Sequence, residues 1–194
     1  MPFVLTVDQR ASRRGPDRVD EALLGLQGAD VLLPFERTAG DEFQGLLDDP
    51  AVVVGVVLDL LREGAWSVGV GAGPVQTPLP ASTRAASGAA FLAARRAVEA
   101  AKQRSARVAV RGAAVTDAED AQAVLSALAA LVERRSPQAW EAIGLVEEGR
   151  TQAEAAAALG ISRQAVGQRL AAGLWELERE LRPAAARLLG RAAG

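Results

Sequence analysis

The sequence predicts an α+β protein: residues 1–115 form a domain of strands and helices, and residues 116–194 form an all-α domain. Strand-like and helix-like segments alternate as far as Gly112, and only helix-like segments follow it. The 194 residues are 49% hydrophobic, which is enough apolar material for a sizeable core. These observations favour a mixed sheet domain followed by a helical one.

A strand, a helix and a hairpin begin the first domain. Residues 2–8 are rich in strand-forming side chains, and residues 16–28 place apolar side chains on one helical face before a terminal glycine. Residues 29–38 and 41–49 form two short strands around a glycine-containing turn. Pro34 favours an edge position for the first of these strands, because proline cannot donate to a ladder hydrogen bond.

Two more helix–strand pairs complete this domain. Asp49 and Pro50 predict the start of a helix that ends near Gly64. Residues 65–75 form a glycine-rich strand, whose glycines do not have the spacing of a dinucleotide-binding loop and are expected to let the strand bend or approach a neighbour closely. A long helix over residues 82–104 and a strand over 106–112 follow.

The resulting β-α-β-β-α-β-α-β order contains the split β-α-β repeat of ferredoxin-like sheets, in which antiparallel strands carry helices on one face. The first strand and the hairpin then lie side by side. Asp8 at the end of the first strand can therefore face Asp41 at the hairpin turn.

Three helices are predicted after the sheet domain, over residues 118–135, 136–149 and from 151 onward. Side chains suited to helix caps precede them: Thr116 or Asp117, Ser136, and a capping box formed by Thr151 and Glu154.

The spacing within residues 137–180 is that of a helix-turn-helix, with Ala156 four positions before Gly160 and with Val166 and Leu170 directed inward. This segment resembles the helix-turn-helix of sigma-factor region four and of LuxR-type regulators, which implies binding to double-stranded DNA. Arginine and glutamine suit the edges of guanine and adenine. The candidate DNA-binding residues on the exposed side are Ser162, Arg163, Gln164, Gln168 and Arg169.

An alternative for this segment is an Ala/Leu-rich helical bundle used for packing or dimerisation. The net charge of −2 favours the bundle. The local charge of residues 162–173 favours DNA, because they contain two arginines and no acid.

Composition restricts the chemistry of the chain. It has no cysteine, histidine or tyrosine, so thiol, imidazole and Cys/His zinc chemistry are excluded, and carboxylates, arginine, lysine and hydroxyls remain. No apolar run is long enough for a membrane span, and the first basic residues follow the amino-terminal apolar stretch, unlike those of a signal peptide. A cytoplasmic protein is therefore expected.

Four segments, residues 4–12, 37–44, 66–75 and 88–97, occur in the order and at the approximate spacing of the corresponding segments of class III nucleotide cyclases. The "AGDEF" stretch is also similar to the GGDEF signature of diguanylate cyclases. More narrowly, "DQRASRRG", "PFERTAGDEFQ" and "PLPASTRAASGAAFLAAR" resemble the SatD family, whose members are predicted regulators.

The resemblance implies a nucleotide-cyclase palm with a Mg²⁺ and nucleotide site. Carboxylates from two neighbouring strands can hold Mg²⁺ and leave it free for substrate phosphates. The implied metal ligands are Asp8 and Asp41, with help from Glu42 and the backbone carbonyl of Gln9. Arg13 and Arg14 would meet phosphates, and Arg95 matches the arginine that stabilises a pentavalent phosphate. The alternative for Asp41 and Glu42 is a solvated hairpin tip.

The chain departs from the cyclase pattern at three positions. Phe91 stands where cyclases have the catalytic asparagine, and Arg37 and Arg84 stand where cyclases have other base-recognising residues. With Gln9, Arg13, Arg14 and Arg95, these two arginines are the predicted nucleotide-binding residues. Loss of the asparagine should reduce turnover more than binding if that residue acts only in the transition state.

The resulting prediction is a homodimeric transcription regulator whose cyclase-like domain binds a nucleotide or cyclic nucleotide second messenger to control DNA binding. Two alternatives remain open. One is an active Mg²⁺-dependent nucleotidyl cyclase with a DNA-binding tail, and the other is a protein–protein adaptor.

Overall fold

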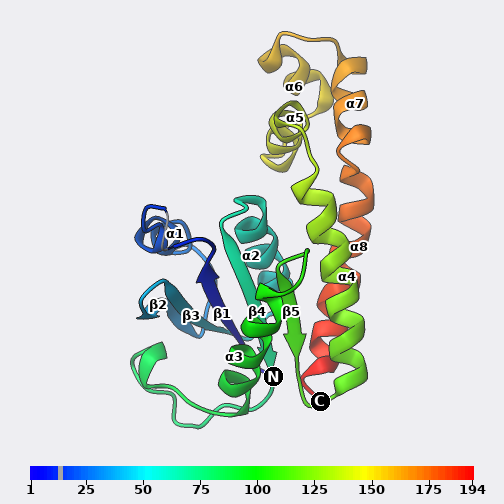
Figure 1. The fold of residues 1–194 in the computed structure, drawn as a ribbon. Coiled ribbons are helices and arrows are strands. Elements are labelled where there is room, and N and C mark those ends of the chain that lie inside the picture. The colour runs from blue at the N-terminus through cyan, green and yellow to red at the C-terminus, as the bar shows by residue number, and fades with distance from the viewer. Residues whose placement is uncertain (13–14) are drawn as a thin grey trace.

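The computed structural model describes residues 1–12 and 15–194 and has an α+β fold (Figure 1). Its described part contains one five-stranded mixed sheet, eight α-helices and one short 3-10 helix. The elements of residues 1–115 follow the predicted β-α-β-β-α-β-α-β order, with the 3-10 helix added before the third helix.

The sheet has the strand order β2-β3-β1-β4-β5. β1 lies between β3 and β4 and is antiparallel to both, β2 is antiparallel to β3, and β5 is parallel to β4. Pro34 lies in the edge strand β2, as predicted. The bounds are β1 Phe3–Gln9, β2 Leu33–Ala39, β3 Glu42–Leu47, β4 Trp66–Ala72 and β5 Val108–Arg111.

The helices are α1 Val19–Gly25, α2 Pro50–Arg62, η1 Thr83–Ala85, α3 Ala89–Lys102, α4 Val115–Glu133, α5 Pro137–Glu147, α6 Gln152–Leu159, α7 Arg163–Ala172 and α8 Trp175–Ala192. The predicted caps at Asp49 and Ser136 and the capping box of Thr151 and Glu154 are confirmed. The prediction that Thr116 or Asp117 caps α4 is wrong, because both lie inside its first turn and Ala114 holds the cap position. None of the described helices combines the length and the apolar content of a membrane span.

The third helix starts later than predicted, at Ala89 instead of near residue 82. Gly88 has a φ of 140°, which is outside the helical region, and it forms an isolated bridge with Val75. The segment before it therefore runs as a loop with one 3-10 turn.

Helices cover both faces of the sheet, so the expectation of helices on one face is wrong for α3. Phe3 and Leu5 of β1 pack against the α2 side, whereas Val4, between them, packs with Ala90 and Ala94 of α3. The glycine-rich strand permits this contact, because a Cβ at position 69 or 71 would collide with the backbone of α3. The expectation of a close approach at these glycines is confirmed.

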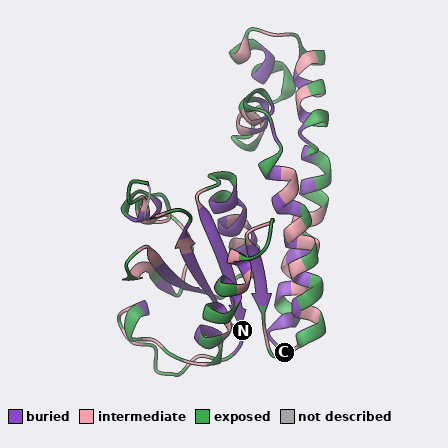
Figure 2. Ribbon diagram, in the orientation of Figure 1, coloured by how far each residue is buried: buried purple, intermediate pink, exposed green. Residues whose placement is uncertain are grey.

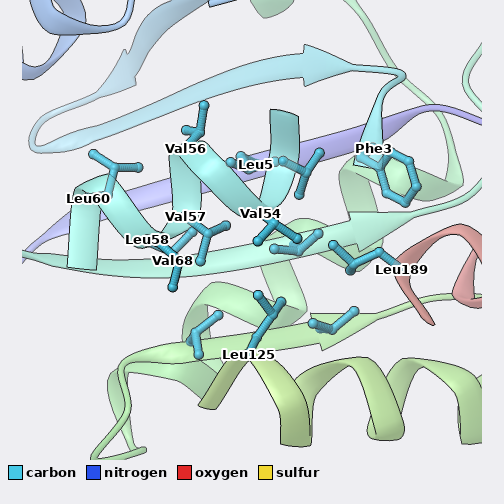
Figure 3. Close-up of a cluster of buried hydrophobic side chains, with 14 of the residues drawn as sticks. Phe3, Leu5, Val54, Val56, Val57, Leu58, Leu60, Val68, Leu125 and Leu189 are labelled. Atoms are coloured by element: carbon cyan, nitrogen blue, oxygen red, sulfur yellow. The ribbon is translucent and has the colours of Figure 1, made fainter. Parts of the chain in front are cut away.

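The main hydrophobic core joins the sheet to α4 and α8. Figure 3 shows Leu5, Val57, Val68, Leu125 and Leu189 in one cluster, drawn from two strands and from α2, α4 and α8. In Figure 2 the buried residues occupy β1, β3, β4 and β5 and the inward sides of these helices, whereas the edge strand β2 is mostly half-buried. The helices α4 and α8, which follow residue 115, therefore share their hydrophobic core with the sheet.

A second cluster holds α5, α6, α7 and the start of α8 together, and we call these elements the head. Its buried members are Ala142, Ile143, Ala155, Ala156, Val166, Leu170 and Trp175. The head lies at one end of the long helices α4 and α8, away from the sheet (Figure 1). We call the sheet with α1, α2 and α3 the body. The long helices α4 and α8 link the body to the head.

Candidate functional site

The carboxylates predicted for the metal site lie at one end of the sheet. The strand register pairs Asp8 with Glu42, so their side chains leave the same face, which is the face covered by α3. Asp41 lies in the hairpin turn, where its carbonyl oxygen accepts a hydrogen bond of 3.1 Å from the backbone N–H of Gln9. The structure therefore places Asp8 and Glu42 side by side, with Asp41 in the adjoining turn.

A lysine that the sequence reasoning missed lies against Asp8. The Nζ atom of Lys102, at the end of α3, is 2.8 Å from Oδ2 of Asp8 and 2.8 Å from Oε1 of Glu99. Burial raises the pKa of Asp8 above its ordinary value, and the hydrogen bond from Lys102 offsets part of this effect. Burial alone would lower the pKa of Lys102, but its two hydrogen-bonded carboxylates raise it overall. Asp8 and Lys102 thus form a partly buried ion pair.

This arrangement does not fit the predicted Mg²⁺ site. No group of three or more acidic side chains in residues 1–12 and 15–194 is arranged to hold a metal ion. Asp8 has its Oδ2 atom on Lys102, and Oε1 of Glu42 accepts a 2.7 Å hydrogen bond from Oγ1 of Thr38. Two of the three predicted ligands are therefore engaged by groups of this chain.

A groove at this end of the sheet is lined by two of the predicted nucleotide-binding residues, Arg84 and Arg95, and by one predicted metal ligand, Glu42. Its volume is about 420 Å³, and it is lined by Thr38, Ala39, Glu42, Gln44, Arg84, Ala86 and Arg95. The lining comes from β2, β3, the segment around η1, and α3. The groove therefore combines two guanidinium groups with a carboxylate, an amide and a hydroxyl.

Glu36 holds the η1 wall of this groove in place. Its Oε2 atom accepts a 2.7 Å hydrogen bond from Oγ of Ser82 and a 3.1 Å bond from the backbone N–H of Arg84. Oγ1 of Thr83 donates a 2.5 Å hydrogen bond to the carbonyl of Pro34. These bonds fix the 3-10 turn against β2 and so position the backbone that carries Arg84.

Phe91 belongs to the apolar floor between α3 and the sheet. It is 4% exposed and clusters with Val4, Leu46, Ala90 and Ala94. It lies one helical turn before Arg95 but does not line the groove. The position at which the cyclase resemblance would require an asparagine is therefore part of a hydrophobic core.

The side chains of Arg37 and Gln9 make their contacts beside α1 and not in the groove. Arg37 contacts Asp17 at 2.7 Å and Asp20 at 3.1 Å, beside α1. Gln9 is buried, with Nε2 donating to the carbonyl of Pro16 and Oε1 accepting from the backbone N–H of Arg18. Both side chains thus hold the connection between β1 and α1, and Arg37 does not line the groove.

Arg13 and Arg14, also predicted to meet phosphates, lie outside the described residues.

In the head, α6 and α7 are joined by a tight turn. Gly160 has a φ of 64°, the left-handed conformation that glycine adopts at a helix end. The backbone N–H of Ile161 donates to the carbonyl of Ala156 at 3.1 Å. Val166 and Leu170 of α7 are buried as predicted, so the opposite side of α7 is free to face solvent.

Four of the five predicted DNA-binding residues are exposed: Ser162 at the start of α7, and Arg163, Gln164 and Gln168 on it. Ser162 and Arg169 also have contacts within the head. Oγ of Ser162 caps α7 by accepting a 3.1 Å hydrogen bond from the N–H of Ala165. Arg169 is 26% exposed and pairs with Glu141 of α5 at 3.1 Å.

A buried charge cluster that the sequence reasoning also missed joins the head to the body. Glu178 of α8 is fully buried and contacts Arg135 and Arg182 at 2.5 Å each. The Arg135 guanidinium lies 4.7 Å from the ring centre of Trp140, and Arg62 of α2 lies 3.9 Å from the same ring. These contacts connect α2, α5 and α8 around one tryptophan.

Comparisons of the chain with protein-family models, with curated proteins and with solved structures gave no match.

Proposed function

We propose that this protein is a DNA-binding transcription regulator whose sheet domain binds a nucleotide or nucleotide second messenger that controls DNA binding. The observation that carries the DNA part is the α6–turn–α7 unit, in which α7 buries Val166 and Leu170 and exposes Arg163, Gln164 and Gln168. The predicted helix-turn-helix has this arrangement, with the second helix as the recognition helix.

The exposed residues of α7 have the chemistry of base readers. Arginine can donate two hydrogen bonds to O6 and N7 of guanine, and glutamine can pair with N6 and N7 of adenine. Arg163 and Gln164 lie in the first turn of α7, the part of a recognition helix that contacts base edges. Ser162 and Arg169 act in this proposal by shaping α7 rather than by contacting bases.

The groove supports the nucleotide part of the proposal. Arg84 and Arg95 can bind phosphate oxygens with charge-assisted hydrogen bonds, and Gln44 can bond polar groups of a base or sugar. The volume of about 420 Å³ falls within the usual range for small-molecule sites. The first four strands, with β1 between β3 and β4, also have the connection of a split β-α-β sheet, in keeping with a ferredoxin-like, cyclase-like domain.

The geometry favours binding over turnover. Phe91 supplies no hydrogen bond to a transition state, and it lies in the apolar cluster under α3 rather than in the groove. The nucleotidyl cyclase alternative therefore has no structural observation in its favour beyond the placement of Glu42 and Arg95.

The two long helices provide a route from the groove to the DNA. α8 places Leu189 in the sheet core and Trp175 in the head core, so a shift of the body against α8 also moves the head. A ligand that binds one arrangement better shifts the population toward it. In a homodimer, this shift changes the spacing of two recognition helices and hence the fit to two half-sites.

Calorimetry with nucleoside triphosphates and cyclic dinucleotides tests the sensor function. We expect one of them to bind, and we expect Arg95→Ala to weaken that binding while Arg187→Ala, an exposed arginine of α8, leaves it unchanged. Failure of every nucleotide to bind would contradict the sensor function.

Gel-shift experiments with genomic fragments at low salt test the DNA function. We expect retardation of a subset of fragments, lost in Arg163→Ala and kept in Arg187→Ala. An absence of retardation, or equal retardation of all fragments, would contradict it.

A further inference from the structure

We propose that Lys102 takes the place at Asp8 that a divalent cation occupies in a metal-dependent nucleotide site, so that the groove binds its ligand without a metal. The identity of the ligand in this inference rests on the proposed nucleotide-binding function. The position of Lys102 does not, because it is given by the contact with Asp8. The inference assigns Lys102 as the residue that sets the metal independence of the site.

The position of Lys102 relative to the groove follows from the geometry of α3. Lys102 lies seven residues after Arg95, which is two helical turns along the same face, or about 10 Å. Arg95 lines the groove and Lys102 contacts Asp8, whose register partner Glu42 also lines the groove. The Asp8–Lys102 pair does not line the groove itself, but Asp8 lies directly opposite the groove residue Glu42 across the β1–β3 ladder.

The contacts of the lysine are those of a counter-ion held in place. Its ammonium group is 2.8 Å from one carboxylate oxygen of Asp8 and 2.8 Å from one of Glu99. The side chain of Asp8 is 17% exposed and that of Lys102 is 30% exposed, so solvent screens the pair only in part. Asp8 is thereby neutralised within the chain.

A divalent ion at Asp8 must displace this ammonium group or accept its repulsion at short range. Mg²⁺ binds oxygens at about 2.0–2.1 Å in a strict octahedral geometry and gives up its water reluctantly. Displacement would leave Lys102 and Glu99 without the partners that they have now. Competition with the lysine therefore weakens metal binding at Asp8 whether or not a nucleotide is present.

Titration with Mn²⁺ alone, followed by electron paramagnetic resonance, tests this assignment without any nucleotide. We expect wild type and Lys102→Arg to have no Asp8-dependent Mn²⁺ site. Lys102→Met, which removes the charge and keeps the apolar stem, should gain such a site with at least about tenfold higher affinity, a difference of about 1.4 kcal/mol. The double variant Lys102→Met/Asp8→Asn should lose it again. Circular dichroism checks that each variant is folded.

The assignment is overturned if wild type binds Mn²⁺ and Asp8→Asn removes that binding, or if Lys102→Met gains no site. A second titration follows nucleotide binding in EDTA and in excess Mg²⁺, where we expect affinities within about twofold of each other. A nucleotide that binds only with Mg²⁺ would also overturn the assignment. If no nucleotide binds at all, the proposed function fails, and the Mn²⁺ titration still decides the role of Lys102.

Discussion

Three arginines near the β2–β3 hairpin differ in what they contact. Arg84 and Arg95 line the groove, whereas Arg37 pairs with Asp17 and Asp20 beside α1. The hydrogen bond from Arg37 lowers the pKa of Asp17 below its ordinary value of 3.8. We therefore assign Arg37 to the stability of the fold and the other two to ligand binding.

This division predicts different outcomes for two alanine substitutions. Arg95→Ala should weaken nucleotide binding by about tenfold or more, because it removes a charge-assisted hydrogen bond. Arg37→Ala should leave nucleotide affinity within about twofold and lower the urea midpoint at neutral pH. Calorimetry and urea titration measure the two effects. A loss of affinity in Arg37→Ala as large as that in Arg95→Ala would contradict the assignment.

The sign of the Arg37 effect with pH follows from the lowered pKa of Asp17. The ionised carboxylate is favoured in the folded state, so the stabilisation is fully present above the ordinary pKa of 3.8 and is lost as the pH falls through the lowered value. The difference in urea midpoint between wild type and Arg37→Ala should therefore shrink as the solution is acidified. A difference that grows on acidification would contradict this origin.

Glu178 is the side chain whose removal should be most costly at the junction of head and body. Its substitution by alanine leaves the nearly inaccessible guanidinium of Arg135 without its carboxylate, at a cost of about 3–5 kcal/mol in unfolding free energy. Arg182→Met should cost less, because that side chain is 34% exposed. Urea denaturation compares them, and a cost for Glu178→Ala below that for Arg182→Met would contradict the account.

The contact between β4 and α3 depends on the missing side chains of Gly69 and Gly71. A Cβ at position 71 would collide with the carbonyl oxygen of Ala90 and the backbone nitrogen of Ala94, which cannot move without shifting the helix. Gly55, inside α2, has no atom within 4 Å of an added Cβ. Gly71 is thus required by the close packing of β4 on α3, whereas no neighbouring atom requires a glycine at position 55.

Alanine substitution at Gly71 and at Gly55 should change the free energy of unfolding in opposite directions. Gly71→Ala should destabilise by about 1–3 kcal/mol through overpacking of β4 against α3. Gly55→Ala should stabilise by about 0.5–1 kcal/mol, because glycine lowers helix stability relative to alanine. Chemical denaturation measures both. A Gly71→Ala variant as stable as wild type would contradict the packing argument for α3 on β4, and a destabilised Gly55→Ala would contradict the argument for α2.

Local signals predicted much of the secondary structure and less of the site. Asp49 with Pro50, Ser136, and Thr151 with Glu154 act within one helical turn, so their caps could be predicted from adjacent residues. The packing of α3 on the second face of the sheet depends on contacts between residues distant in sequence, so it could not be predicted from adjacent residues.

The groove also depends on contacts between residues distant in sequence. Glu42, Arg84 and Arg95 line one groove, although they come from three separate segments. The sequence could not predict which face of the sheet Arg37 occupies. β2 has register irregularities on both sides of the Glu36–Arg37 pair, so its side chains do not simply alternate between the two faces. Lys102 was missed because its partner Asp8 lies on a strand distant in sequence.

Two helices link the sheet to the head, and the proposed coupling between the groove and DNA binding rests on this continuity. α4 and α8 contribute Leu125, Leu128 and Leu189 to the sheet core, and α8 continues into the head through Glu178 and Trp175. An arrangement with an independent helical domain on a flexible linker would allow no such connection. Ligand binding and DNA binding are therefore expected to be coupled.

The coupling itself is the most direct test of the account. Fluorescence anisotropy measures the affinity for a DNA fragment selected by gel shift, with and without a saturating nucleotide identified by calorimetry. We predict that the nucleotide changes DNA affinity by about 5- to 150-fold, as a coupling energy of 1–3 kcal/mol requires, and that Arg163→Ala loses the preference for this fragment over a scrambled one. Equal affinity for selected and scrambled DNA, or an affinity that saturating nucleotide leaves unchanged, would contradict a regulator controlled through the groove.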